Sequence, residues 1–137
     1  HLSLGHTYTR HPTAAALSLK NIELYEKYHL IEKIQKTSTV FENRINDIYN
    51  LDMVGEIRHK GMVMGIELVQ NKNSNKPLSS KTSINKLVFD EGRKHQIYFR
   101  TLGNIIMLVP PLDISQKDLN FLIDGTISTI KSLSRKL

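Results

Sequence analysis

Apolar residues recur every three or four positions in two successive stretches near the beginning of the chain. In residues 12–28 these positions are Ala15, Leu19, Ile22, Tyr25 and Tyr28. In residues 30–49 they are Ile31, Ile34, Phe41, Ile45 and Ile48. That spacing is the period of an amphipathic helix, and Pro12 suits the first turn of one. We therefore predict two helices, the first of them half buried, after an opening loop over residues 1–11.

The period then shortens to about two, which is typical of strands. It does so over residues 53–59 and 62–69, and Gly61 between them supplies the positive φ that a tight turn requires. These residues predict a β-hairpin. Gly65, inside the second strand, indicates either a bulge or a place where another backbone or a ligand comes close. Residues 70–80 are polar and contain a proline, so we predict an exposed loop there.

Helical spacing returns over residues 81–95 and again near the end of the chain, where Ser115 and Asp118 form a start signal for a last helix. Between these helices, residues 97–100 and 105–109 predict two short strands joined by a turn that contains Gly-Asn. The predicted order is ααββαββα. Strands in hairpins with helices between them favour an α+β domain, in which a small, mainly antiparallel sheet is covered by helices on one face.

The amino-acid composition excludes several kinds of site but does not identify the function. The 137 residues include no cysteine, which excludes disulfides, thiolate zinc sites and cysteine nucleophiles. The net charge is +6, but the lysines are scattered without interleaved aromatic residues, which favours a solvated basic surface over a nucleic-acid-binding stripe. Because no apolar run approaches the roughly 20 residues that cross a bilayer, we expect a soluble, cytoplasmic protein without membrane or nucleic-acid partners.

Three segments, taken in order, carry a family signature. The first is 5–12 (GHTYTRHP), the second comprises 54–58 (VGEIR) and 61–68 (GMVMGIEL), and the third comprises 99–106 (FRTLGNII) and 110–112 (PPL). They resemble the G-x-T-[YF]-x-G-[HN]-P, V-G-[DE]-[IV]-R…G-[LM]-x-x-[GA]-[IV]-E-L and R-x-x-G-[DN]-[VI]-[IL]…P-P-[LY] patterns of the class III aminotransferases, which depend on pyridoxal phosphate. Together these segments span almost the whole chain.

The resemblance implies a fold-type I aminotransferase, of which residues 12–137 would be the C-terminal small domain and residues 1–11 a loop of the cofactor-binding large domain. In the family, the lysine that binds pyridoxal 5′-phosphate covalently lies upstream of the G-x-T segment, and none of the lysines here has a matching context. We therefore expect a piece of a longer protein, with no catalytic residue in this chain and no transaminase activity by itself.

The same resemblance assigns ligand roles to four residues. Thr7 matches the family threonine whose hydroxyl and backbone N–H bind the cofactor phosphate of the neighbouring subunit, which implies a homodimer, and His6 is its neighbour at the cofactor. Arg100 matches the arginine that pairs with the substrate carboxylate through two parallel hydrogen bonds, and Tyr8 would line the substrate entrance. From the residues alone, a loop turn or cap for Thr7 and a surface position for the other three are the simpler interpretations.

Arg10 departs from the family pattern, which has Gly at that position and thereby implies a positive φ. An arginine adopts that conformation at a cost of about 1 kcal/mol, so the course of the loop is open at this point. His1, His6 and His11 lie five residues apart, a spacing unsuited to metal coordination, and we predict no metal site.

The substrates are a small-molecule amino donor and a keto acceptor, chosen among those of the class. Residues 5–9 and 100–112 resemble most the members of biotin synthesis that transfer an amino group from S-adenosylmethionine to 8-amino-7-oxononanoate. An ω-amino-acid:pyruvate aminotransferase is the alternative. A non-enzymatic basic α+β binding module is a second alternative, which steeply salt-dependent binding to DNA would favour.

Overall fold

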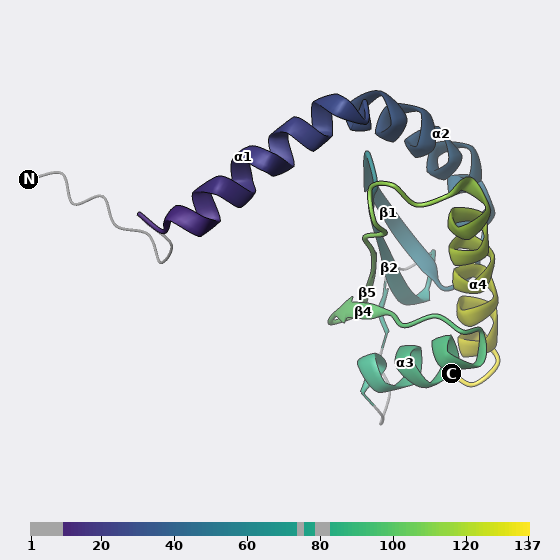
Figure 1. Ribbon diagram of the computed structural model, residues 1–137. Helices are drawn as coiled ribbons and strands as arrows, with labels where there is room; N and C mark the ends of the chain where they lie inside the picture. Colours follow the sequence, from purple (N-terminus) through teal and green to yellow (C-terminus); the bar gives the residue numbers. More distant parts are fainter. Residues whose placement is uncertain (1–9, 74–75, 79–82) are drawn as a thin grey trace, which may run out of the picture.

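The computed structural model in Figure 1 describes residues 10–73, 76–78 and 83–137. In chain order, its elements are α1 (Pro12–Lys27), α2 (Leu30–Tyr49), β1 (Val54–Lys60), β2 (Val63–Asn71), β3 (Lys76–Pro77), α3 (Ile84–Lys94), β4 (Arg100–Leu102), β5 (Ile105–Leu108) and α4 (Gln116–Ser134). Helices α2, α3 and α4 lie beside the sheet, whereas α1 extends away from it (Figure 1). The predicted α+β architecture with a small antiparallel sheet is confirmed.

The sheet has the strand order β1-β2-β5-β4, and each neighbouring pair is antiparallel. β1 and β2 form the predicted first hairpin, in which Gly61 has a φ of 57°. β4 and β5 form a second hairpin around Gly103, whose φ is 61°. Both glycines thus adopt the left-handed conformation that tight turns require. Pairing of β5 with β2 places the second hairpin beside the first.

The core lies between one face of the sheet and the helices α2, α3 and α4. Residues that are at most 2% exposed form its centre: Phe41, Ile48, Val54, Met64, Ile66, Leu68, Val88, Ile106, Leu108, Leu119, Ile123, Ile130 and Leu133. In β5 the core residues alternate with half-buried or exposed neighbours, whereas in β2 Gly65 and Val69 between and beside them are buried as well. The helical core residues recur at intervals of three, four or seven positions, as predicted. The core therefore uses one face of each element.

Two helices begin with side-chain caps. The Oγ atom of Ser115 accepts the Asp118 backbone N–H at 3.1 Å, which confirms the predicted start of α4. The Nδ1 atom of His11 accepts the Ala14 backbone N–H at 3.0 Å at the start of α1. Between α1 and α2, His29 has a φ of 50°, and this left-handed residue separates the two helices.

The prediction that the first helix is half buried is wrong for the described residues. α1 contains no buried residue, and Leu17, Leu19 and Ile22 are 66%, 66% and 58% exposed. It adjoins the rest of the fold only at its C-terminal end, next to α2 (Figure 1). Apolar periodicity reports that a helix is amphipathic, but it does not show whether a surface covers the apolar stripe.

Two other predictions need correction around the second strand. The exposed loop expected over residues 70–80 is shorter, because β2 continues to Asn71 and Lys76–Pro77 pair with it as β3. Gly65 is not a bulge, because it pairs regularly with Arg58 in β1 and with Met107 in β5. The irregularity in the β1–β2 ladder lies between Val54 and Glu56 instead.

The boundaries around α3 also differ from those predicted. The helix begins at Ile84, after Ser83, rather than at residue 81, and the strand expected over 97–100 is displaced to Arg100–Leu102. Ile97 and Phe99 are buried against the helix glycines Gly125 and Gly92, and the segment before Arg100 follows these helix contacts instead of pairing with β5. The turn between β4 and β5 is correspondingly reduced to Gly103 and the residue that follows it.

A buried carboxylate connects α3 to the C-terminal end of the chain. Glu91 is 4% exposed, and its Oε1 atom accepts hydrogen bonds from Lys136 and, at 2.8 Å, from Lys94. The hydrogen bond from Lys136 is the largest of the causes that lower the pKa of the Glu91 carboxyl, followed by that from Lys94. In turn, Glu91 raises the pKa of Lys94. These contacts hold the end of the chain against α3.

Candidate functional site

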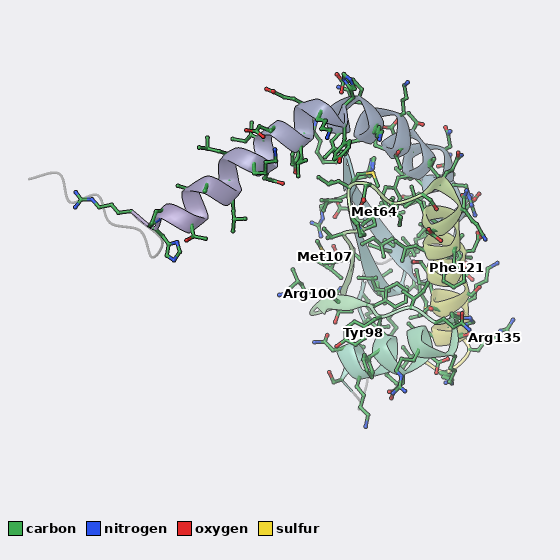
Figure 2. The ribbon with its side chains drawn as sticks, viewed as in Figure 1. Met64, Tyr98, Arg100, Met107, Phe121 and Arg135 are labelled. Atoms are coloured by element: carbon green, nitrogen blue, oxygen red, sulfur yellow. The ribbon has the colours of Figure 1, made fainter. Side chains whose placement is uncertain are left out.

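Arg100 lies at the edge of the sheet, on the face that the helices leave uncovered. Side chains alternate along a strand, so Arg100 and Leu102 are exposed while Thr101, which pairs with the buried Ile106, points toward the helices. Figure 2 shows Arg100 and its cross-strand partner Met107 on the side of the sheet away from α4. The sequence placed Arg100 at the end of a strand, and the structure corrects this, because Arg100 begins β4.

A mostly apolar hollow of about 480 Å³ borders Arg100, between the β4–β5 hairpin and the beginning of α4. Its lining consists of Gln96, Ile97, Tyr98, Phe99, Arg100, Met107, Leu108, Val109, Pro110, Pro111, Ile114, Phe121 and Leu122. Tyr98, Val109 and Phe121 are 80%, 64% and 50% exposed, so large apolar side chains are open to solvent here. A cation next to such a surface suits a ligand with an apolar body and a negatively charged end.

The charge of Arg100 is available for a ligand. Among the described residues it has no ion-pair or hydrogen-bond partner, whereas Arg58 is paired with Glu56 and Glu67. Arg44 is likewise paired, and its hydrogen bonds to Asp124 and Asp47 raise its pKa. An exposed arginine is ordinary by itself. The combination of an unpaired guanidinium with the apolar hollow distinguishes Arg100 from these two.

A second hollow lies over the uncovered face. It is lined by Arg58, His59, Lys60, Val63, Gly65, Ile105 and Met107. A Cβ atom at Gly65 would lie 3.5 Å from Ile105 and 3.7 Å from Met107, which is ordinary contact. No described residue therefore excludes a side chain at Gly65.

The other predicted ligand residues, Thr7, His6 and Tyr8, lie outside the described residues. The described chain begins at Arg10, which has a φ of 62°. Arg10 thus keeps the left-handed conformation that the family glycine implies, despite the steric cost of a side chain there. Of the three N-terminal histidines only His11 is described, and it caps α1.

The described lysines include several that are held by specific partners. Lys94 and Lys136 bind Glu91, and Lys20 binds Glu23 at 2.5 Å. Covalent attachment to an aldehyde cofactor requires a neutral amine, which a raised pKa opposes. The pKa of Lys94 is raised, so this lysine is unsuited to that role.

Sequence reasoning missed the part of the hollow that α4 contributes. Phe121 is half exposed between Leu119 and Ile123, which are fully buried. The available signal was its position, since an aromatic side chain on the polar side of an amphipathic helix is often part of a contact surface. Tyr98, two residues before Arg100, offered the same signal.

Comparison with known proteins defines the family. Residues 1–130 match the family described as Aminotransferase class-III. The chain therefore belongs to the class III aminotransferases, as its motifs predict.

Particular relatives are longer than this chain. The adenosylmethionine-8-amino-7-oxononanoate aminotransferase of Geobacter sulfurreducens is 30% identical over 130 residues, which are 95% of this chain and 29% of the relative. The enzyme of the same name from Methanocaldococcus jannaschii is 35% identical over 127 residues, 93% of this chain and 28% of the relative. A probable mitochondrial gamma-aminobutyrate transaminase 3 of Oryza sativa subsp. indica is 29% identical over 133 residues, which are 97% of this chain and 26% of the relative. The chain spans less than a third of their length.

Solved structures show the same fold. The crystal structure of the Methanocaldococcus jannaschii enzyme superposes with a TM-score of 0.87 at 34% identity, covering 96% of this chain and 30% of that one. The omega transaminase from Pseudomonas jessenii, in complex with PMP, has a TM-score of 0.85 at 22% identity, covering 98% and 30%. The fold of the described residues is therefore that of one part of a transaminase.

Proposed function

We propose that residues 12–137 form the C-terminal small domain of a pyridoxal 5′-phosphate-dependent aminotransferase, and that residues 1–11 are a loop of its large domain. Family membership supports the proposal, as does the share of each relative that the chain covers. The exposed apolar residues of α1 also support it, because a large domain and a second subunit would cover them. The enzyme is proposed to act as a homodimer with the phosphate site shared between subunits.

Pyridoxal phosphate, when bound, supplies the electron sink that amino-group transfer needs. In the proposal, the hydroxyl and backbone N–H of Thr7 donate hydrogen bonds to its phosphate, with His6 beside them. Arg10 and the amino end of α1 follow in the chain, and the positive partial charge of a helix N-terminus suits an anion. We propose that the lysine that binds the cofactor covalently lies in a part of the protein outside these 137 residues. This chain alone is therefore expected to transfer no amino group.

Arg100 is proposed to bind the carboxylate of the substrate. Its planar guanidinium binds a carboxylate through two parallel hydrogen bonds, a geometry that an ammonium group does not provide. The apolar hollow beside it accepts the rest of the substrate, with Tyr8 at the entrance. The observation on which this depends is the guanidinium on the uncovered face of the sheet, which has no ion-pair or hydrogen-bond partner among the described residues.

Three variants of the full-length protein test these roles. Arg100→Lys keeps the charge and loses the two-pronged geometry, so single-turnover rates with a carboxylate-bearing amino donor should fall about ten- to a hundredfold while the cofactor survives desalting. Thr7→Val should do the reverse. Arg135→Lys is the matched control, because Arg135 is exposed at the opposite end of α4 (Figure 2). Equal losses in both assays for the first two variants would contradict the assignment.

For the reaction itself, we propose transfer of an amino group from S-adenosylmethionine to 8-amino-7-oxononanoate, as in biotin synthesis. The names of the relatives support this choice, and an ω-amino-acid:pyruvate aminotransferase is the alternative. Turnover of the full-length protein with S-adenosylmethionine, but not with β-alanine or γ-aminobutyrate, is expected, and the opposite preference would favour the alternative. We propose a cytoplasmic enzyme without nucleic-acid or membrane partners, and no described helix is both long and apolar enough to cross a bilayer.

A further inference from the structure

We infer that helix α3 sets the position of Arg100, and that Asn85 and Thr101 are positioning residues for carboxylate binding although neither contacts the carboxylate. The inference rests on the proposed role of Arg100. It concerns a group of contacts between α3 and the segment of residues 98–101, which the proposed function does not use.

β4 needs support from outside the sheet. It is three residues long, it is an edge strand, and within the described residues it pairs only with β5. Short edge strands are held by few ladder hydrogen bonds and are the first part of a sheet to open. Arg100 is the first residue of this strand, so its placement depends on what holds the strand from the side of the helices.

A side-chain hydrogen bond joins that side of β4 to α3. The hydroxyl of Thr101 donates to the Oδ1 atom of Asn85 at 2.6 Å. Because Thr101 points toward the helices and Arg100 points away from them, this bond fixes the backbone next to Arg100 from the face opposite the guanidinium. Removing it changes no group that a substrate would touch.

Two further contacts place the residues before Arg100. The ring of Phe89 lies 5.2 Å from that of Tyr98 at an interplanar angle of 89°, an edge-to-face arrangement. The ring of Phe99 packs directly on Gly92, where a Cβ atom would lie 2.5 Å from Cδ2 of Phe99. Gly92 therefore gives Phe99 the space it occupies.

The three residues of α3 share one face of the helix. Asn85, Phe89 and Gly92 are spaced by four and three positions, which brings them into line along a helix. Their partners Thr101, Tyr98 and Phe99 flank Arg100 on both sides in the chain. A bidentate pair tolerates little misplacement of the guanidinium, so a shift of β4 against α3 would weaken carboxylate binding in particular.

The test uses the full-length protein with S-adenosylmethionine as donor and two amino acceptors, 8-amino-7-oxononanoate and its analogue that lacks the carboxylate. Thr101→Val keeps the shape of the side chain and removes the donor. It should raise KM for 8-amino-7-oxononanoate about three- to tenfold, the usual effect of one neutral hydrogen bond, with kcat and the values for the analogue unchanged. Thr101→Ser should restore the wild-type KM, and Asn85→Ala should reproduce the loss.

Two comparisons distinguish positioning from general damage. In an Arg100→Ala background, Thr101→Val should cause no further loss, because the two residues act through one interaction. Thr39→Val is the matched control, since Thr39 is an exposed helical threonine whose hydroxyl donates to the Lys36 carbonyl at 2.6 Å. It should leave both acceptors unaffected.

The outcomes separate this inference from the proposed function. If Arg100→Ala leaves the preference for 8-amino-7-oxononanoate over the analogue without a carboxylate intact, the proposed role of Arg100 fails. If Arg100→Ala removes that preference, but Thr101→Val and Asn85→Ala preserve it or impair both acceptors equally, α3 does not position Arg100 and the inference is overturned.

Discussion

Replacing Gly92 with alanine should destabilise the fold, although alanine is the better helix former. A Cβ atom at this position would lie 2.5 and 2.8 Å from two ring carbons of Phe99 and 2.9 Å from the carbonyl oxygen of Ile97. All three distances are shorter than normal contacts. The ring is buried and the carbonyl belongs to the backbone, so neither can move without disturbing the segment that leads into β4.

The net effect follows from two opposing contributions. Alanine gains at most about 1 kcal/mol of helix propensity over glycine, and less in the last turn of a helix. Overpacking of a buried site typically costs about 1–3 kcal/mol. We therefore expect Gly92→Ala to lower the free energy of unfolding by about 1–2 kcal/mol, as measured by urea denaturation of the 137-residue chain with circular dichroism.

Gly125 provides the matched control in α4. A Cβ atom there would collide with Cδ1 of Ile97, the far end of a flexible side chain, and would lie 3.7 Å from the nearest backbone oxygen, that of His95. Gly125→Ala should therefore cost less than Gly92→Ala, because rotation of Ile97 relieves the contact. A Gly92→Ala variant as stable as the wild type, or a loss larger at Gly125 than at Gly92, would refute the packing argument.

Three further changes test other parts of the fold. Gln96 follows α3 with a φ of 61°, a left-handed conformation that glycine adopts more easily. Gln96→Gly should therefore raise the free energy of unfolding by up to about 1 kcal/mol, as measured by urea denaturation. In the same assay the control Gln35→Gly, in the exposed interior of α2, should lower it by a similar amount. Because the pKa of Glu91 is lowered in the folded chain, its contribution is present above its ordinary pKa of 4.5 and is lost as the pH falls through the lower folded value. The stability difference between the wild type and Glu91→Gln should therefore shrink from pH 7 to pH 3, and an unchanged difference would contradict the role of its lysine partners. Phe41 is fully buried and Phe121 is 50% exposed, so Phe41→Ala should cost about 3–5 kcal/mol and Phe121→Ala far less, in the same assay.

Local chemistry made most of the fold predictable. The two turns depend on glycines with positive φ, the last helix depends on a Ser115 cap, and the core depends on apolar periods of two and 3.6. β4 was displaced because Ile97 and Phe99 have the composition of a strand but pack against Gly125 and Gly92. Such a contact joins residues of different elements, so it cannot be predicted from the hydrophobic period of a single segment.

The candidate site was predictable in a different way. Arg100 was singled out by its motif, and the structure adds that it has no ion-pair or hydrogen-bond partner in the described part of the chain and that it borders an apolar hollow. The contribution of Phe121 and the bond from Thr101 to Asn85 were not visible, because both require the tertiary arrangement of α3, α4 and the β4–β5 hairpin. A motif can single out the group that is proposed to bind, whereas the groups proposed to position it are found only from the packing of the folded chain.

The exposed apolar side chains of α1 need a surface that the described residues do not provide. Leu17, Leu19 and Ile22 are exposed on a helix that adjoins the described fold only at one end. Burying one such side chain contributes about 1.5–3 kcal/mol, and an isolated helix of this length is marginal in water. If this chain is one part of a dimeric aminotransferase, as proposed, burial in that assembly stabilises these apolar side chains of α1. The uncovered sheet face would then place Arg100 toward the same interior, so the surfaces that this chain leaves open are those that the complete site requires.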